Sequence, residues 1–158
     1  MVREPSFEQY ARALRKAHSY IGKTVPELEF RRVDNDGLLR LSNLQGRAVL
    51  LNLWATWCTP CVHEMPDLEQ LQRTHGELGL VVVTLSDESR QHLVTFLEEH
   101  PVETLNVYQE SLGWIYDTEA RPMNFLISPD GVLLDCTEMP GDGTYGAFAD
   151  WVDEHLKT

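Results

Sequence analysis

The sequence predicts an α/β domain in which a central mixed β-sheet is flanked by helices. Two continuous apolar runs of strand length, 48–53 and 80–85, are typical of strands covered on both faces. Each run is followed by a segment with apolar residues at helical spacing, and the chain closes with a predicted hairpin and a last helix. This order indicates parallel strands that are extended by antiparallel ones.

The segment before the first apolar run predicts a helix and a hairpin. Ser6 and Gln9 fit a capping box, and the apolar residues that follow recur at helical spacing. The turn Asp34-Asn-Asp-Gly37 then separates two runs with strand character, as in a hairpin. The expected elements of this segment are a helix over 7–21 and hairpin strands over 28–33 and 38–41.

The remainder of the chain alternates between helical and strand patterns. A helix is expected to begin at Pro60 and to bend at Pro66, and Pro101 should stop the next helix. After the helix that begins at Pro60, the expected elements are a strand over 80–85, a helix over 88–100, a strand over 104–108, a helical turn over 112–116, hairpin strands over 123–127 and 132–136, and a helix over 145–156.

Length and composition favour one domain. The 158 residues, of which 42% are hydrophobic, suffice for one buried core. We expect a single domain over 1–158, with a helical extension over 1–21 and a core with an N-terminal hairpin over 22–158. The formal net charge of -12 disfavours nucleic acid and anionic membrane surfaces as partners.

The sequence offers no membrane-spanning or signal segment. No stretch approaches the roughly 18 apolar residues that a spanning helix needs. Arg12, Arg15 and Lys16 stand where a signal peptide would need its apolar centre. We therefore expect a soluble chain without membrane insertion. We also expect a monomer.

Two of the three cysteines, Cys58 and Cys61, are only three positions apart. A ring this small contributes little through loop closure, so the pair indicates redox chemistry rather than a structural disulfide. Because Cys58 is expected just before a helix, unpaired backbone N–H groups would face its thiolate, which predicts an acidic, exposed nucleophile. Cys61 would be the more buried resolving thiol. Pro60 suits the first helical position because its missing N–H is not needed there.

A zinc site is the alternative interpretation of this pair. Zinc usually takes four ligands, and beyond the pair the sequence offers only His63 and the distant Cys136. We therefore expect no metal and no cofactor apart from the redox-active Cys58–Cys61 disulfide. Cys136 itself lies in a predicted strand and is expected to be a small buried hydrophobic residue.

The cysteine segment also carries a family resemblance. The run Val49-Leu-Leu-Asn-Leu-Trp-Ala-Thr-Trp-Cys-Thr-Pro-Cys-Val-His-Glu-Met-Pro66 resembles the thioredoxin-like proteins of the TlpA/ResA type, and the resemblance extends from about Gly22 to the last helix. It includes the Gly22-x-x-x-Pro26 segment, Gly46 and the strand after Pro122.

The resemblance implies a thioredoxin fold and a thiol:disulfide oxidoreductase. Many proteins of this type reduce disulfides of partner proteins by dithiol–disulfide exchange, so the implied partners are protein disulfides and an upstream thiol electron donor. Because most of them act outside the cytoplasm, the resemblance also implies an extracytoplasmic location, periplasmic or membrane-tethered, with the signal or anchor outside these residues. A cytoplasmic location is the alternative.

The resemblance assigns a third catalytic residue. In the family's C-x-x-C-x-x-E-x-P pattern, Glu64 would be a partly buried acid that carries protons to or from the cysteines. Spacing alone would favour a solvated helix glutamate. Asn52 stands six residues before Cys58, where ordinary thioredoxins carry an aspartate, which leaves Glu64 as the proton carrier; Asn52 is expected to satisfy buried backbone groups.

Substrate binding is expected at Trp57, Thr59, Pro60, Arg121 and Pro122. The resemblance implies the role of Pro122, whereas Arg121 stands where relatives commonly carry a smaller or apolar residue. Pro122 would be the cis-proline opposite the cysteines, and an exposed backbone at Arg121 could pair with an extended substrate peptide. The Arg121 side chain could favour the Cys58 thiolate, select an acidic partner or point into solvent. Trp57 is expected to contribute an apolar rim, whereas Trp54 is expected in the core.

Two other functions stay open. Thiol peroxidases share the same core and the upstream Gly/Pro segment, although they usually carry a lone peroxidatic cysteine rather than a C-x-x-C pair. A non-enzymatic domain could use the pair to bind metal or a partner in a redox-dependent way. Peroxide turnover would support the former, and absence of a two-electron couple the latter.

Overall fold

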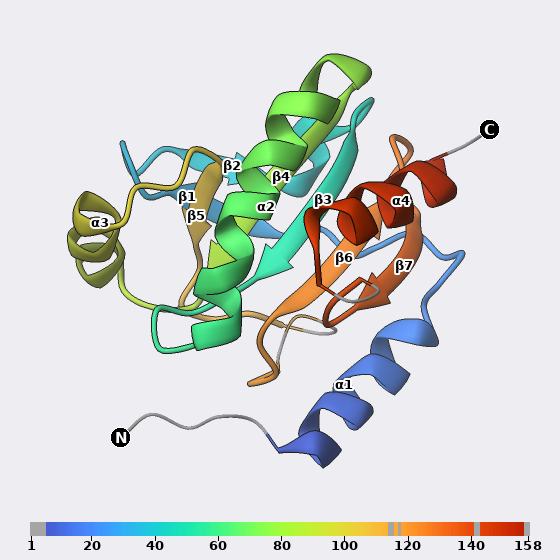
Figure 1. The fold of residues 1–158 in the computed structure, drawn as a ribbon, viewed down its shortest axis with the longest axis horizontal. Coiled ribbons are helices and arrows are strands. Elements are labelled where there is room, and N and C mark those ends of the chain that lie inside the picture. Colours follow the sequence, from blue (N-terminus) through green and yellow to red (C-terminus); the bar gives the residue numbers. More distant parts are fainter. Residues whose placement is uncertain (1–5, 114–115, 117, 141–142, 157–158) are drawn as a thin grey trace.

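The computed structural model describes residues 6–113, 116, 118–140 and 143–156. Within these ranges, seven strands form one mixed sheet in the order β2-β1-β5-β4-β3-β6-β7 (Figure 1). The strands are β1 (Glu29–Arg32), β2 (Leu38–Arg40), β3 (Ala48–Leu53), β4 (Leu80–Ser86), β5 (Leu105–Tyr108), β6 (Met123–Ile127) and β7 (Leu133–Thr137).

The middle of the sheet contains the two apolar runs of the sequence. Strand β3 pairs with β4 in parallel and with β6 in antiparallel orientation, and every residue of β3 is buried. This burial explains why the run is apolar without alternation. The hairpin β1–β2 extends the sheet because β1 pairs antiparallel with β5. The predicted mixed sheet and the hairpin extension are therefore confirmed.

Helices cover both faces of this sheet. They are α1 (Phe7–His18), α2 (Thr59–His75), α3 (Arg90–Glu99) and α4 (Tyr145–Leu156), with short 3-10 turns over Leu41–Leu44 and Gly76–Leu78. Helices α2 and α4 cross one face, α3 lies near β5 and packs on the same apolar cluster as α2, and α1 lies near β6 and β7 (Figure 1). Because successive strand residues face opposite sides, Leu50 packs under α2 while Leu51 belongs to the cluster that α1 covers.

Several predicted boundaries differ from the structure by a few residues. The first helix ends at His18 rather than at Ile21. The helix expected from Glu88 begins at Arg90, because the Ser89 side chain accepts the N–H of His92 and caps it. Helix α2 continues through Pro66. The helical turn expected over 112–116 falls partly outside the described residues. Among the described helices, none is long and apolar enough to cross a membrane.

Candidate active site

The two close cysteines lie at the start of α2, directly after β3. Cys58 is the N-cap residue, and its Sγ accepts the backbone N–H of Cys61 at 3.2 Å. The two residues form a disulfide, with their Cα atoms 5.2 Å apart. Pro60 is the second helical residue rather than the first, and its missing N–H is not needed at this position either. The free N–H groups of the helix end thus point towards Cys58, as the sequence predicts.

Both cysteines are buried, with exposed fractions of 2% for Cys58 and 0% for Cys61. The expectation of an exposed Cys58 is therefore wrong for this disulfide form. The reason is that both residues belong to the apolar cluster under α2, which also contains Trp54 and Met65. Thr59, the next residue, is exposed, so a partner would approach Cys58 from the side of its accessible neighbours.

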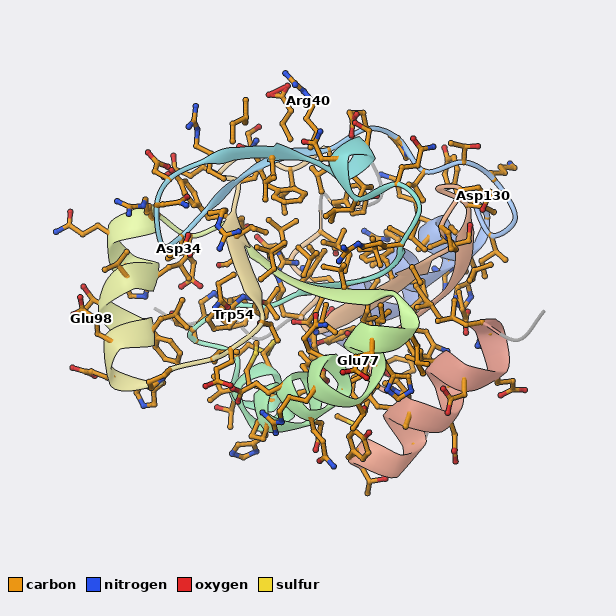
Figure 2. The ribbon with its side chains drawn as sticks, turned by 90° about the horizontal axis from the view of Figure 1, so that it is seen from above. Asp34, Arg40, Trp54, Glu77, Glu98 and Asp130 are labelled. Carbon is orange, nitrogen blue, oxygen red and sulfur yellow. A yellow bond between two sulfur atoms is a disulfide. The ribbon has the colours of Figure 1, made fainter. Side chains whose placement is uncertain are left out.

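The two tryptophans of this segment have different surroundings. Trp54 is 1% exposed, and its ring lies 5.7 Å from that of Phe96. It sits inside the molecule, whereas Arg40 and Glu98 project from the periphery (Figure 2). Trp57 is only half-buried and packs against the cluster under α2. The expected core position of Trp54 is confirmed, and Trp57 supplies accessible apolar surface beside Cys58.

Glu64 lies one turn after Cys61 and is buried, with an exposed fraction of 5%. Burial raises the pKa of its carboxyl group to about 8; a hydrogen bond from Asn124 opposes this rise, Asp67 adds to it, and Asn52 opposes it. A carboxyl group with this pKa releases and takes up protons near neutral pH. The expectation of a solvated helix glutamate is thus wrong.

Two buried asparagines hold the Glu64 carboxyl group. Its Oε1 accepts hydrogen bonds from Asn52 Nδ2 at 2.9 Å and from Asn124 Nδ2 at 3.1 Å. Asn52 Nδ2 also donates to Asn124 Oδ1 at 2.8 Å. Oε2 of Glu64 has no partner within the part of the chain that the structure describes. Because Oε1 already accepts two N–H groups, Oε2 is the oxygen on which a proton is best accommodated.

The asparagine pair comes from the sheet register. Asn52 of β3 lies directly opposite Asn124 of β6. Asn52 satisfies side chains rather than backbone groups, so that expectation is wrong. Asn124 was missed because the two residues are 72 positions apart, and only the pairing of β3 with β6 brings them together. The one signal in the sequence that could have indicated Asn124 is the presence of an asparagine in a predicted buried strand, two residues after Pro122.

Glu88 holds the loop that leads from β3 to Cys58. Its carboxylate accepts the Thr56 N–H at 2.8 Å and the Thr56 hydroxyl at 2.6 Å. It also accepts the Ser86 hydroxyl at 2.8 Å. The Thr56 hydroxyl lies 2.8 Å from Nε2 of His92. This role was not predicted, because Glu88 was expected inside a helix. In the structure Ser89 is the N-cap of α3, so Glu88 lies before the helix and its side chain faces the loop.

The peptide bond between Arg121 and Pro122 is cis, as expected. Leu53 at the end of β3 pairs with Met123 at the start of β6, so Pro122 lies beside Trp54, at the level of the cysteine loop. This register follows from the antiparallel pairing of β3 and β6. Pro122 therefore stands close to the segment that carries Cys58.

Arg121 is buried, with an exposed fraction of 2%. Its Nη1 donates to the Thr118 carbonyl at 2.5 Å and to the Ala120 carbonyl at 2.9 Å, and its Nη2 lies 3.4 Å from Asp87. Burial lowers the pKa of Arg121, and Asp87 opposes this effect. The expectations of an exposed backbone and of a side chain in solvent are both wrong, because the guanidinium group binds its own loop.

A surface pocket of about 210 Å³ opens beside the start of α2. Thr59, Pro60 and Glu64 contribute to its wall, so three of the residues predicted for the site meet there. Arg121 and Pro122 do not line it; both are buried. The other lining residues are His63, Met139 and Gly143.

Cys136 is free and buried in β7, as predicted, with an exposed fraction of 1%. Burial raises the pKa of its thiol, and Asp135 adds to the rise. Such a thiol stays protonated and unreactive. Within the described ranges, His, Cys, Asp and Glu side chains form no group of three or more that could hold a metal ion.

Comparison with known proteins agrees with this geometry. The model of the AhpC/TSA family matches residues 21–135, which is most of the chain and includes both cysteines of the pair. The chain belongs to this family. The match begins after α1 and ends within β7.

Relatives within the family carry a more specific name. A thiol-disulfide oxidoreductase ResA of Oceanobacillus iheyensis is 30% identical over 72% of this chain and 62% of its own length. ResA of Bacillus thuringiensis is 31% identical over 76% of this chain and 70% of its own length. The chain thus spans about two thirds of these relatives. These findings place it among the thiol-disulfide oxidoreductases of the family.

Solved structures show the same fold. A crystal structure described as a candidate thiol:disulfide interchange protein DsbE from Chlorobium tepidum is 24% identical, covers 87% of this chain and 98% of its own, and has a TM-score of 0.77. A thiol:disulfide interchange protein of the thioredoxin family from Chlorobium tepidum TLS is 21% identical, with coverages of 85% and 96% and a TM-score of 0.69. The thioredoxin fold is confirmed.

Proposed function

We propose that this protein reduces disulfides of partner proteins by dithiol–disulfide exchange through Cys58 and Cys61, with Glu64 as the proton carrier. The observation that carries this proposal is the bonded pair at the start of α2, backed by a buried carboxyl group with a raised pKa. Its relatives named thiol-disulfide oxidoreductase support the same chemistry.

The first step is attack by the Cys58 thiolate on one sulfur of a partner disulfide. A bond forms between this sulfur and Cys58 Sγ, the partner disulfide breaks, and the released partner sulfur leaves as a thiolate that takes up a proton. The free N–H groups at the start of α2, including that of Cys61, stabilise the attacking thiolate.

The second step releases the partner. Cys61 gives up its proton and attacks Cys58 Sγ, the mixed disulfide breaks, and the second partner sulfur leaves as a thiolate. Two electrons thus pass from the Cys58–Cys61 dithiol to the partner. Glu64, one helical turn from Cys61, takes the proton when ionised and supplies one when protonated. A thiol donor then reduces the Cys58–Cys61 disulfide again.

Substrate contact is assigned to the residues around the pair. Trp57, Thr59 and Pro60 offer accessible surface next to Cys58. The backbone at Arg121 and Pro122 would pair with an extended stretch of the partner, because it directly precedes β6 and lies beside the cysteine loop. In this role the proposed partners are protein disulfides and an upstream thiol donor.

The test is the reduction potential of the Cys58/Cys61 couple. The protein is equilibrated in graded thiol/disulfide buffers, and alkylated cysteines are counted by mass spectrometry. A value near or below about -250 mV is expected for a reductase, whereas one above about -180 mV would indicate an oxidase or isomerase. No two-electron couple at all would overturn the enzyme proposal and favour the metal-binding or docking alternative.

A thiol peroxidase is the second candidate function, favoured by the match to the AhpC/TSA family. In that case a cysteine of the pair would be oxidised by peroxide to a sulfenic acid, with release of one water, and the other would condense with it to the disulfide, with release of a second. Consumption of hydrogen peroxide with a thiol donor, faster than exchange with a protein disulfide, would establish this function instead.

We also propose an extracytoplasmic location, which rests on the resemblance to proteins of the TlpA/ResA type. Fractionation of cells that produce the full-length protein tests it, with a cytoplasmic enzyme as marker. Recovery with the cytoplasmic marker would support the alternative location.

A further inference from the structure

Three segments that are distant in the sequence meet at one edge of the sheet. Strand β3 lies between β4 and β6 (Figure 1), and Leu53 at its end pairs with Leu85 of β4 and with Met123 of β6. The cysteine loop therefore leaves this edge between Asp87–Glu88, which follow β4, and Arg121–Pro122, which precede β6. The proposed function uses the cysteine loop and the segment before β6, and it assigns nothing to the two acidic residues.

Glu88 is fixed by its own segment before it reaches the cysteine loop. The Ser86 hydroxyl donates to Glu88 Oε1 at 2.8 Å, and the Glu88 N–H donates to Ser86 Oγ at 3.2 Å. In this position the Glu88 carboxylate accepts both the backbone N–H and the hydroxyl of Thr56. The Glu88 side chain is only 15% exposed, so water competes little for these bonds, and hydrogen bonds to a carboxylate are stronger than neutral ones.

Thr56 lies in the turn that sets the position of Cys58. The Cys58 N–H donates to the Ala55 carbonyl at 3.1 Å, which places Thr56 and Trp57 at the corners of this turn. Because Glu88 binds the backbone and the side chain of Thr56, it ties the turn to the end of β4. The location of Cys58 Sγ depends on this turn, and misplacement of a reacting atom by about 1 Å can slow a reaction by about 10²-fold.

Asp87, the neighbour of Glu88, contacts the segment on the other side of the cysteine loop. Its carboxylate lies 3.4 Å from Nη2 of the buried Arg121. The Arg121 guanidinium group also binds the carbonyl groups of Thr118 and Ala120, so it connects Asp87 to the backbone that precedes Pro122. Since a buried charge is costly without its partner, the contact with Asp87 holds this backbone at the edge of the sheet.

We propose that Asp87 and Glu88 are positioning residues for the disulfide exchange: Glu88 aligns Cys58 for attack, and Asp87 aligns the backbone before Pro122 for an extended partner. This inference rests on the proposed function, because it concerns the reaction of the Cys58–Cys61 pair. One two-residue segment thereby sets the spacing between the attacking sulfur and the bound peptide. A small disulfide needs only Cys58, so its reduction depends on Glu88, whereas reduction of a peptide disulfide depends on both residues.

Substitution of Glu88 tests the first role. The reduced protein is mixed with a small aromatic disulfide or with a disulfide-linked peptide of extended sequence, and both rate constants are measured. Glu88→Ala should lower both about tenfold, the equivalent of one charge-assisted hydrogen bond. Glu88→Gln should keep both, because the amide oxygen accepts the Thr56 N–H. Its NH₂ group donates to the Thr56 hydroxyl, which then donates to His92 Nε2, 2.8 Å away.

Glu27→Ala is the matched control. Glu27 Oε1 also accepts two backbone N–H groups, of Leu28 at 3.1 Å and of Ser42 at 3.0 Å, but it lines a pocket with Val49, near the start of β3 rather than its end. This variant should lose stability in denaturant unfolding and keep both rate constants. Wild-type rates in Glu88→Ala, or rates in Glu88→Gln as low as those in Glu88→Ala, would overturn the role of Glu88.

The loop side of the contact gives a second test that leaves Glu88 in place. Thr56→Val keeps the backbone N–H and the volume but removes the hydroxyl group that donates to Glu88, so both rate constants should fall about fivefold. Thr56→Ser keeps the hydroxyl group and should match the wild type. Equal rates in these two variants would contradict the alignment of Cys58 through Thr56.

Asp87→Asn tests the second role through the ratio of the two rate constants. The rate constant with the peptide disulfide should fall about fivefold while that with the small disulfide stays unchanged, because only the peptide contacts the backbone before Pro122. Asp34→Asn is the matched control, because it removes the carboxylate that pairs with Arg32 in the N-terminal hairpin. The control should leave the ratio unchanged, and an unchanged ratio in Asp87→Asn would overturn the paired role of Asp87 and Glu88.

The two proposals fail in different ways. If the reduced wild-type protein exchanges with neither disulfide, the proposed function is wrong, and the positioning roles with it. If the wild-type protein exchanges with both disulfides and the variants of Asp87 and Glu88 react at the same rates, the proposed function stands and the positioning roles are wrong.

Discussion

Cys61 and Cys136 are equally hidden from solvent, with exposed fractions of 0% and 1%, yet their surroundings differ. Cys136 lies within β7, where burial raises the pKa of its thiol. Cys61 lies in the first turn of α2, bonded to Cys58, and Glu64 follows one turn later. Exposure therefore does not separate the redox pair from the inert thiol, whereas the polar groups near each sulfur do.

Around the pair, those polar groups are themselves buried. Glu64 is held by Asn52 and Asn124 at the interior of the molecule. A carboxyl group buried without a cation beside it keeps its proton to a higher pH, at a cost in free energy. The pair thus gains a proton donor and acceptor that titrates near neutral pH, and the fold loses stability for it.

The different surroundings of the redox pair and of Cys136 predict the largest difference in exchange rate when the cysteines themselves are substituted. Cys58→Ser should reduce the exchange rate with a protein disulfide to the uncatalysed background, because it removes the nucleophile. Cys136→Ala should keep the wild-type rate, because a buried thiol with a raised pKa is not a nucleophile. Thiol-dependent reduction of insulin disulfides measures both rates. A loss of activity in Cys136→Ala would show that the two sites are coupled.

Glu64→Gln is expected to have the next largest effect. The amide keeps the shape and the burial but neither releases nor takes up a proton near neutral pH. Exchange should therefore slow by about 10²-fold, as for loss of a general acid–base group. The wild-type rate should depend on pH with an apparent pKa of about 8, and the variant should lack this dependence. Glu77→Gln, at an exposed position after α2, is the control. An identical pH profile in Glu64→Gln would contradict the proton-carrier role.

The same carboxyl group should couple stability to pH. The folded pKa of Glu64 is about 8, above the ordinary value of 4.5, so the folded state binds more protons between these values and stability falls as the pH rises through them. The loss should approach about 5 kcal/mol at high pH, and Glu64→Gln should lack it. Denaturant unfolding of the oxidised protein at several pH values measures the difference. Parallel pH curves for both proteins would refute the raised pKa.

The sequence was informative where local pattern decides the structure. The mixed sheet, the hairpin, the position of Cys58 at a helix start and the cis bond before Pro122 are all as predicted. Strand-length apolar runs and turn residues determine the sheet, the hairpin and the helix start within a few neighbouring positions, whereas the cis bond followed from the family resemblance. The family resemblance also assigned Glu64, which spacing alone would have placed in solvent.

Features that depend on packing between distant segments escaped prediction. A loop arginine is usually solvated, but Arg121 binds the carbonyl groups of Thr118 and Ala120 and pairs with Asp87. The contact between Asn124 and Glu64 requires the register of β3 against β6. A one-residue slip of this register would turn Asn124 to the other face, which no local pattern reveals.

Asn124→Ala should have the smallest of these effects and tests how the carboxyl group is tuned. It removes one hydrogen bond to Glu64 Oε1 and leaves the Asn52 amide with one acceptor fewer, which should cost about 2 kcal/mol of unfolding free energy. Because the Asn124 hydrogen bond lowers the pKa of Glu64, its loss should move the apparent pKa of the exchange rate upward from about 8. Asn106→Ala is the matched control: this half-buried asparagine of β5 donates to the Val102 carbonyl, so its loss should destabilise the fold without moving that pKa. An unshifted pKa in Asn124→Ala would mean that desolvation alone sets the proton affinity of Glu64.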